Sequence, residues 1–428
     1  MAVVPVSEEL YATLPLEKRR KCMVRRALKQ TSVLMSVVVL MASMSVLWAS
    51  AAPKVGDYEI LFQWNHLDWK LADEAMKADF EKNEYWKGAM PAGFKVDAEG
   101  NYYLSVPRWA PGIPATLNKV VMADGKPVLE AFPSWEMNEV GNPDAIQSVL
   151  GYEIDENGVM WILDQGHVNG APSIDGSQKL VLWDLKANTL IESVKIPTEI
   201  APYAASFLND LAVDNQDGFV YIADSGIFSD PLQGGLIVYN MQTKQLRRVL
   251  NQHESVQDVP GFWFKIAGKK VWKDTPMRTG ADGIALSADR KTLYWCPLTG
   301  RNLYAIETAF LQDFNTPMSM IKDAVRNLGS KGTNTDGMTA DNQGNIYYTM
   351  LEEQGVGIYN PATGFKKFIT DDRMVWVDGI CFDNKGYILF NNNRLHELFG
   401  GELDWNDPTN LIIWKAYVGE GVKSYLLK

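Results

Sequence analysis

The sequence predicts an all-β fold, a six-bladed β-propeller preceded by an N-terminal signal peptide. Two observations predict the propeller: a short phrase built on a glycine occurs six times, and each copy leads into a turn and a second strand-like run. A third observation, a basic segment followed by an uncharged one, predicts the signal peptide. The chain is therefore divided into a leader at residues 1–51 and a propeller at residues 52–428.

The repeated phrase consists of a small or acidic residue, a glycine, alternating apolar residues, an aspartate and a second glycine. Successive copies are 58, 59, 73, 54 and 42 residues apart. Periods of this size indicate one supersecondary unit that is repeated along the chain. The copies are centred on Gly93, Gly151, Asp210, Gly283, Gly337 and Gly379.

Each copy has the pattern of a β-hairpin. In the fifth copy the alternating run ends at Asp341, a polar turn follows, and residues 346–349 form a second apolar run. Period-two alternation bounded by Asp, Asn and Gly is typical of paired strands. Further strand-like runs follow, so each unit holds about four short antiparallel strands, which is the composition of a propeller blade.

The segments between the copies are predicted to be insertions and closing elements. Residues 73–83 and 318–327 show helical periodicity, and residues 255–278 form a long loop that we expect to cover one face. We also expect residues 59–62 and 411–414 to lie in the same blade or in adjacent blades, closing the ring.

The N-terminal segment predicts export. Residues 1–31 carry seven basic side chains, residues 32–51 carry no charge, and the segment ends in Ala49-Ser50-Ala51. This order is typical of a cleaved secretory signal peptide, and an uncleaved membrane anchor is the alternative. Either way the propeller is expected to be secreted or periplasmic, with no membrane contact after cleavage.

The charge of residues 52–428, the part expected to be exported, limits the classes of partner that we expect. Residues 1–51 contain seven of the 41 basic and three of the 52 acidic residues, so the remainder has 34 basic and 49 acidic side chains, a net charge of −15. This charge disfavours nucleic acid and anionic membranes and is consistent with a cationic ligand or simply with a soluble exported surface. Cys296 and Cys381 lie in strand phrases, and we expect buried free thiols.

Several site classes are absent from the sequence. The four histidines, His66, His167, His253 and His396, form no metal-binding spacing, and we expect them at the surface. There is also no G-x-S-x-G elbow and no P-loop. No residue is therefore assigned as a metal ligand.

Polar residues at the head of the blade phrase predict a site at one mouth of the channel. The first strand of each blade lines the channel, and its start shares a face with the end of the second strand. The same logic places the ends of the second strands, including Asp164 and Trp109, at this mouth. The candidate residues for the site itself are Asn209, Asp210, Asp282, Asp336, Asp378, Trp295 and Asn391.

Three interpretations of this ring are open. Converging carboxylate and amide oxygens suit Ca²⁺, and acids beside aromatic faces suit an organic ammonium ion. The third interpretation is structural, since Asp or Asn before Gly often caps a turn. Several carboxylates on one axis would repel each other, however, so some would need a cation or a proton.

The phrases also resemble the major royal jelly protein/yellow family over roughly residues 57–400. The resemblance rests on residues 210–214 with 220–225, 282–287 with 292–298, 107–117 and 391–395. It implies a six-bladed, secreted propeller; some insect members convert dopachrome, some salivary members bind biogenic amines, and others have no catalysis. The chain lacks the paired cysteines usual in insect members, so it is more similar to the bacterial dopachrome-tautomerase-related branch.

A more distant similarity, carried by Asp282-Gly283 and Asp336-Gly337, is to gluconolactonase/regucalcin-type propellers. An equivalent of their metal-binding glutamate is missing near the first blade, so no cofactor is assigned, and Ca²⁺ remains an open candidate.

The sequence thus predicts a propeller that binds a small aromatic or cationic metabolite and that could act as a dopachrome-type tautomerase. Asp282, Asp336 and Asp378 are the candidate general bases, Asn209 would orient the ligand, and Trp295 would stack on it. A non-catalytic amine-binding protein and a Ca²⁺-dependent lactone hydrolase are the alternatives. Ligand identity, turnover and oligomeric state are not determined by the sequence.

Overall fold

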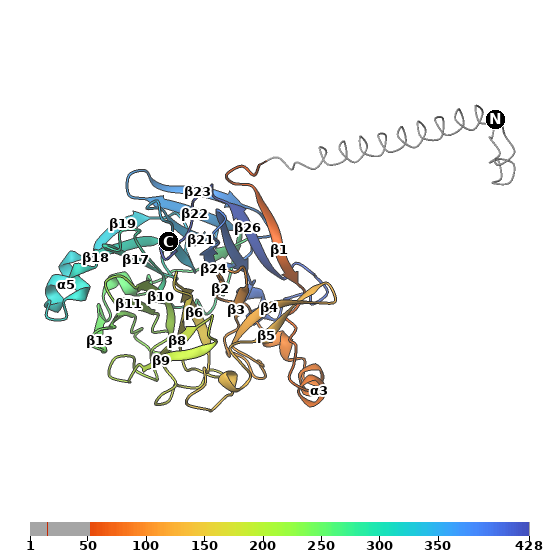
Figure 1. The fold of residues 1–428 in the computed structure, drawn as a ribbon. Helices are drawn as coiled ribbons and strands as arrows, with labels where there is room; N and C mark the ends of the chain where they lie inside the picture. The colour runs from red at the N-terminus through yellow and green to blue at the C-terminus, as the bar shows by residue number, and fades with distance from the viewer. Residues whose placement is uncertain (1–14, 16–51, 428) are drawn as a thin grey trace. The chain divides into compact units, whose positions relative to one another are not determined.

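The computed structural model describes Pro15 and residues 52–427 and confirms the six-bladed propeller. Six four-stranded antiparallel sheets are arranged around a centre, with strands such as β2, β6, β10 and β24 innermost and β1, β5, β9 and β13 at the periphery (Figure 1). The signal peptide predicted for residues 1–51 lies, apart from Pro15, outside the described residues. Among the described residues, no helix is long and apolar enough to cross a membrane.

Blades 1 to 6 are numbered in the order of their innermost strands, and each is given from the inside outward. Blade 1 is β2 (Phe94–Val96), β3 (Tyr102–Ser105), β4 (Leu117–Ala123) and β5 (Lys126–Ala131). Blade 2 is β6 (Val149–Ile154), β7 (Val159–Asp164), β8 (Lys179–Asp184) and β9 (Thr189–Lys195). Blade 3 is β10 (Leu208–Asp214), β11 (Phe219–Asp224), β12 (Gly235–Asn240) and β13 (Gln245–Val249).

The second half repeats the plan. Blade 4 is β16 (Ala281–Leu286), β17 (Thr292–Pro297), β18 (Asn302–Glu307) and β19 (Arg326–Ser330). Blade 5 is β20 (Met338–Ala340), β21 (Ile346–Met350), β22 (Gly355–Asn360) and β23 (Gly364–Thr370). Blade 6 is β24 (Val377–Phe382), β25 (Tyr387–Asn392), β26 (Leu411–Tyr417) and β1 (Tyr58–Trp64).

Blade 6 closes the ring, as the sequence predicts. Its outermost strand, β1, comes from the start of the propeller and pairs antiparallel with β26 from Tyr58 opposite Ala416 to Trp64 opposite Leu411. Figure 1 shows β1 beside the strands of the C-terminal blade. The two ends of the fold are thereby held in one sheet by main-chain hydrogen bonds.

Helices and short hairpins occupy the connections between strands. The predicted helices are present as α3 and α5, and the long segment 255–278 begins with the end of a 3₁₀ turn and contains a two-stranded hairpin, β14 with β15. Cys296 and Cys381 are buried free cysteines, as expected. The remaining elements are α3 (Glu74–Lys82), α4 (Ala309–Gln312), α5 (Met318–Ala324), α6 (Leu395–Gly400), β14 (Lys265–Ile266), β15 (Lys269–Lys270), and the 3₁₀ turns η1 (Tyr85–Gly88), η2 (Glu136–Asn138) and η3 (Glu254–Val256).

The core lies between neighbouring blades. Apolar side chains of one sheet pack on those of the next, and Tyr221 of blade 3 and Ile284 and Trp295 of blade 4 belong to one such buried cluster. Innermost strands also contact the innermost strands of their neighbours. Because each blade buries both faces, inner strands such as β16 are buried throughout.

The C-terminal segment crosses the lower end of the channel, where the hairpin turns of the blades lie. The hydroxyl of Tyr425 donates to Val213 O at 3.0 Å and accepts from Val213 N at 3.2 Å. The nitrogen of Tyr425 donates to Ala340 O, and Leu426 O accepts from Glu156 N. The segment thus ties blades 2, 3 and 5 together at the end opposite the candidate site.

Candidate functional site at the upper channel mouth

The residue before the repeated glycine lies at the upper mouth of the channel in every blade. In blades 2, 3, 4 and 6 the pairing of the first two strands is interrupted at this position, for example between Val149 and Tyr152. Bulges of this kind redirect a side chain out of the regular alternation. The six residues, called the mouth ring below, are Ala92, Leu150, Asn209, Asp282, Asp336 and Asp378.

The glycines of the phrase allow the ring to be this narrow. A Cβ atom placed on Gly337 would lie 2.3 Å from Asp378 O of the next blade, and one on Gly283 would lie 2.7 Å from Asp336 O. Glycine is therefore required here because backbone approaches backbone, not because of a positive φ. Blade 3 differs, since Asp210 stands where the other blades have glycine.

Each carboxylate of the mouth ring receives one neutral N–H on its Oδ2 atom. Asn209 Nδ2 donates to Asp282 at 2.7 Å, Trp376 Nε1 donates to Asp336 at 2.8 Å, and Asn393 Nδ2 donates to Asp378 at 2.7 Å. In the part of the chain that the structure describes, these three carboxylates form no ion pair with a basic side chain. Three acids are thus held close together without a protein cation of their own.

Burial and mutual repulsion make these carboxyl groups hard to ionise. Burial, with the negative charges of the other ring acids, raises the pKa values of Asp282 and Asp378 well above the ordinary range. Burial raises the pKa of Asp336 to about 6, although hydrogen bonds from Trp376 and with Asp282 act in the opposite direction. Because ionisation of one of these acids opposes ionisation of the others, a proton on one of them is shared among the three.

A small cavity of about 30 Å³, lined by Asp210, lies below the mouth ring. There Lys95 Nζ lies 2.7 Å from Glu153 Oε1 and 3.2 Å from Ile380 O. Burial raises the pKa of Asp210 to about 7, despite the nearby Lys95 charge. Asp210, predicted to bind ligand, is therefore below the mouth ring rather than among the residues that line the cavity above it.

The cavity above the ring has a volume of about 230 Å³ and one aromatic wall. Trp109 lies 5.9 Å from Phe207 and 6.2 Å from Phe399, and Phe207 lies 5.8 Å from Phe228. Asn209, Asp282, Asp336 and Asp378, all predicted from the sequence, line the same cavity. The cavity therefore combines carboxylates from blades 4 to 6 with an aromatic surface over blades 1 to 3.

Part of this wall is indicated by the sequence. Trp109, predicted at this mouth, lines the cavity, and Phe207 was missed although it stands two residues before Asn209. Phe228 and Phe399 lie in a connection and in α6, where no repeat indicates their position.

His167 also lines the cavity and is not at the surface as expected. It is 1% exposed, its ring lies 4.4 Å from that of Phe228, and burial lowers its pKa. Its Nδ1 contacts Ala171 O at 2.8 Å and its Nε2 contacts Ser206 O at 2.9 Å. Both partners are carbonyl oxygens, which only accept, so the neutral ring donates to one of them, and the face of the ring packs against Phe228. His396 is likewise largely buried.

Two residues predicted for the site lie elsewhere. Trp295 is fully buried between blades 3 and 4, where its Nε1 donates to Ser255 O at 2.9 Å. Asn391 is fully buried, and its Nδ2 donates to Pro91 O at 3.1 Å. Both side chains project into the blade packing, because alternation along β17 and β25 directs them away from the cavity. Neither lines it.

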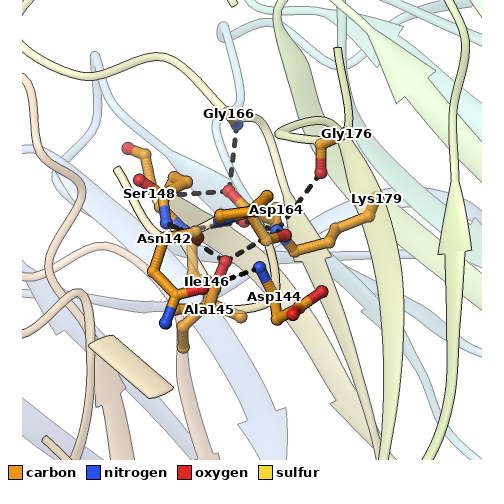
Figure 2. A network of polar contacts seen from close by, with 12 residues as sticks. Asn142, Asp144, Ala145, Ile146, Ser148, Asp164, Gly166, Gly176 and Lys179 are labelled. Atoms are coloured by element: carbon orange, nitrogen blue, oxygen red, sulfur yellow. Dashed lines mark hydrogen bonds and ion pairs between the residues drawn. The ribbon is translucent and has the colours of Figure 1, made fainter. Parts of the chain in front are cut away.

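Asp164 is a structural anchor and not a member of the ring. Figure 2 shows its carboxylate between Lys179 and the segment that leads into β6. The Asp164 oxygens accept from Gln147 N at 2.7 Å, Ser148 N at 2.9 Å and Gly166 N at 3.0 Å, and Lys179 Nζ lies 3.5 Å away. The carboxylate is completely buried and thereby fixes the approach to Leu150.

Blade 3 repeats the same anchor beside the site. Asp224 accepts from Phe207 N at 2.8 Å and Ser206 Oγ at 2.6 Å, and Arg248 Nη1 donates to it at 2.6 Å. This bonding holds the backbone that carries Phe207 and Asn209. The aromatic wall and the amide of the ring are thus set by a buried ion pair.

The connection at residues 255–278, called the insertion loop below, was predicted to cover one face, and the structure places it over the face that carries the mouth. Its Phe264 and Trp272 belong to an apolar cluster with Trp376, and its Met277 lines the cavity. Helix α6, which packs in the same cluster, contributes Leu395 and Phe399 to the cavity. These two elements cover the carboxylate side of the site.

Among the described residues, no group of three or more His, Cys, Asp or Glu side chains is arranged to hold a metal ion. The oxygen atoms that converge at the mouth belong to carboxylates that accept hydrogen bonds from neutral N–H groups. A cavity lies above these carboxylates. This arrangement can pair with one positive charge, exchange protons with a ligand, or do both.

Comparison with known proteins gives one family. The family model described as major royal jelly protein matches residues 147–425. Major royal jelly protein 3 of Apis mellifera is 27% identical over 71% of this chain and 55% of its own length. Protein yellow of Drosophila madeirensis is 26% identical over 86% of this chain and 67% of its own length. The match thus spans about half to two thirds of these relatives.

Solved propellers are more distant. A luciferin-regenerating enzyme is 15% identical, with a TM-score of 0.47 over 78% of this chain and 93% of that chain. A gluconolactonase from Xanthomonas campestris is 12% identical, with a TM-score of 0.48 over 86% of this chain and 92% of that chain. At these scores neither structure bears on the activity of this chain.

Proposed function

The chain belongs to the major royal jelly protein family, and we propose that it binds a small organic cation with an aromatic or apolar body at the upper channel mouth. The observation that carries the proposal is the cavity in which Asp282, Asp336 and Asp378 lie on one side and Trp109 and Phe207 on the other. A positive charge beside the acids gains Coulomb attraction, and an adjacent aromatic face adds cation–π attraction.

The size of the cavity limits the ligand. Its volume of about 230 Å³ is smaller than the roughly 300–1,000 Å³ of pockets for drug-sized ligands. Ala92 and Leu150 complete the ring on the apolar side. A single ring system with a short ammonium-bearing side chain fits both the volume and this division into an acidic and an apolar half.

Calorimetry on the purified protein tests this function. The panel contains dopamine, serotonin, a quaternary ammonium analogue of each, and neutral analogues that lack the amine. Binding of the amines and quaternary ions, with at least tenfold weaker binding of the neutral analogues, supports the proposal. Equal binding of charged and neutral analogues, or no binding of either, contradicts it.

Turnover of a quinonoid such as dopachrome is a second candidate function. Tautomerisation removes a proton from carbon and returns one to oxygen, and it needs a carboxyl group that is available in both protonation states. The raised pKa values of Asp282, Asp336 and Asp378 favour such a role. Loss of dopachrome absorbance that is faster with the protein than with the Asp282→Asn, Asp336→Asn, Asp378→Asn variant supports it, and equal rates contradict it.

Two further parts of the proposal have separate tests. A melting temperature that rises with Ca²⁺ and falls again with EDTA would favour a metal-dependent lactone hydrolase instead of a cation binder. Export rests on the charge pattern of residues 1–51, and the N-terminal sequence of the protein recovered outside the cytoplasm tests both export and cleavage after Ala51.

A further inference from the structure

Trp376 lies between the mouth ring and the two elements that cover it. Its Nε1 donates to Asp336 Oδ2 at 2.8 Å. On its other sides the indole lies 5.3 Å from Phe264 and 5.5 Å from Trp272 of the insertion loop, and it stacks on His396 of α6 at 5.6 Å. One fully buried side chain therefore contacts a site carboxylate and both covering elements.

The backbone at Trp376 is held in an unfavourable conformation. Its φ is +57°, in the left-handed region that bulky residues rarely adopt. Its carbonyl accepts from Asn393 N at 3.1 Å, and the Asn393 side chain in turn donates to Asp378. Strain of this kind persists only where the surroundings enforce it and is concentrated at functional sites. Here it directs the indole N–H at Asp336.

We propose that Trp376 is a positioning residue that couples the charge state of Asp336 to the packing of the insertion loop over the cavity. The proposal rests on the cation-binding function proposed above. A bound cation keeps Asp336 ionised, the ionised carboxylate holds the indole N–H more strongly than a neutral one does, and the fixed indole holds Phe264 and Trp272. Ligand binding and closure of the cavity are thereby linked through one side chain.

Charged and titratable groups surround Asp336 on several elements. The nearest acids are Asp282 on β16, Asp378 on β24 and Asp210 on β10. Lys95 and Glu153 form an ion pair below the ring. On the far side of the indole is His396, whose pKa is lowered to about 4 by burial, so it is neutral above that pH. The remaining groups that interact with this acid are Cys296 on β17 and, next to it, Lys331.

Among these contacts, the hydrogen bond from the Trp376 indole to Asp336 is the one that can be removed by a conservative substitution, Trp376→Phe, without changing any charge. Loss of a donor to an ionised carboxylate makes ionisation harder. The pKa of Asp336 should therefore rise by about one unit in Trp376→Phe. Cation binding would then require a correspondingly higher pH.

The experiment measures two quantities on Trp376→Phe and on the wild type from pH 4.5 to 8.5. The first is the affinity for a quaternary ammonium ion, which does not itself titrate. The second, without ligand, is the rate of trypsin cleavage at the exposed lysines of the insertion loop, Lys265, Lys269, Lys270 and Lys273, divided by the rate for an unstructured lysine peptide at the same pH. Trp161→Phe is the matched control, since its buried indole also donates to a carboxylate, that of Asp155, away from the cavity and the insertion loop.

The expected result for Trp376→Phe is a pH midpoint about one unit higher and normalised cleavage at least threefold faster near pH 7, with Trp161→Phe unchanged. Unchanged midpoint and cleavage in Trp376→Phe, or equal changes in Trp161→Phe, would overturn the proposal. If the wild type binds no cation, the cation-binding function fails while cleavage still decides the role of Trp376. If Trp376→Phe does not fold, Asp336→Asn replaces it, and its normalised cleavage rate should be independent of pH between 5 and 7.

Discussion

Asn209 Nδ2 donates to Asp282 Oδ2 at 2.7 Å across the boundary between blades 3 and 4. The same amide nitrogen lies 3.2 Å from Ser225 Oγ, which donates to Ala281 O at 2.6 Å. A neutral donor thus orients the most deeply buried acid of the ring without neutralising it. Because no basic side chain among the described residues forms an ion pair with Asp282, a bound cation can take that place and favour the ionised form of this acid.

Asp282→Asn should weaken binding of a quaternary ammonium ion at least tenfold at pH 8, because it removes a carboxyl group that can ionise beside the bound cation while preserving the shape of the side chain. Calorimetry at pH 8 measures the change. Asp289→Asn, at an exposed hairpin turn of the same blade, is the control and should bind like the wild type. Equal affinities for Asp282→Asn and wild type would show that this acid does not meet the cation.

Affinity for a quaternary ammonium ion should rise between pH 5 and pH 8. The pKa values of the ring acids are raised, that of Asp336 to about 6, so protonation of Asp336 removes negative charge as the pH falls through this range. The ligand carries a permanent charge and contributes no titration of its own. An affinity that does not change between pH 5 and pH 8 would mean that the acids are already ionised at pH 5.

Asp378→Asn should stabilise the protein at pH 8 and have a smaller effect at pH 5. An acid with a raised folded-state pKa binds its proton more tightly in the folded state, so its contribution is fully present below its unfolded pKa of about 3.9 and is lost as the pH rises through the folded pKa. The neutral amide avoids that loss. Urea unfolding at both pH values measures the difference, and a destabilised variant at pH 8 would contradict it.

Gly337→Ala should lower the free energy of unfolding by about 1–3 kcal/mol, the usual cost of overpacking. The added Cβ would lie 2.3 Å from Asp378 O, which is backbone and cannot rotate away. Gly400→Ala is the control, because its nearest neighbour is the flexible Glu402 side chain at 3.4 Å. Similar losses of unfolding free energy in Gly337→Ala and Gly400→Ala would show that the mouth ring tolerates a wider spacing between the backbones of neighbouring blades.

Trp109→Leu should reduce affinity for an aromatic ammonium ion about fivefold to tenfold, since it removes a face worth ~1 kcal/mol or more for a cation. Leucine keeps the surface apolar, so the neutral analogue should lose less. Trp135→Leu is the comparison, because Trp135 lines a separate groove and not this cavity. If Trp109→Leu weakens charged and neutral analogues equally, the indole contributes only apolar area.

The repeat made the fold and half of the site predictable from sequence. The spacing of the phrase determined six blades, and the position before the glycine located Asn209, Asp282, Asp336 and Asp378 at one mouth. Trp295 was misplaced because nearness along a hairpin does not specify which way a strand residue faces. Asp164 was misplaced because a buried acid with several backbone donors has the same sequence pattern as an exposed one.

The rest of the site comes from contacts between parts of the chain far apart in sequence. Phe228, Phe399 and the insertion loop occupy connections that do not repeat, so no period indicates where they pack. Trp376 stands two residues before Asp378, but its role depends on a left-handed backbone and on a loop about 100 residues earlier. Such relationships require the tertiary structure.

The pairing of β1 with β26 has a consequence for how the chain is made. Trp64 is paired with Leu411, so β1 has no partner until the chain has been made as far as β26. Until then both β1 and β25 present unpaired edges, which favour association with other chains. Contacts so distant in sequence also form slowly. A translation product that stops before residue 411 would keep both edges exposed, so the last strand decides whether the nascent chain stays soluble.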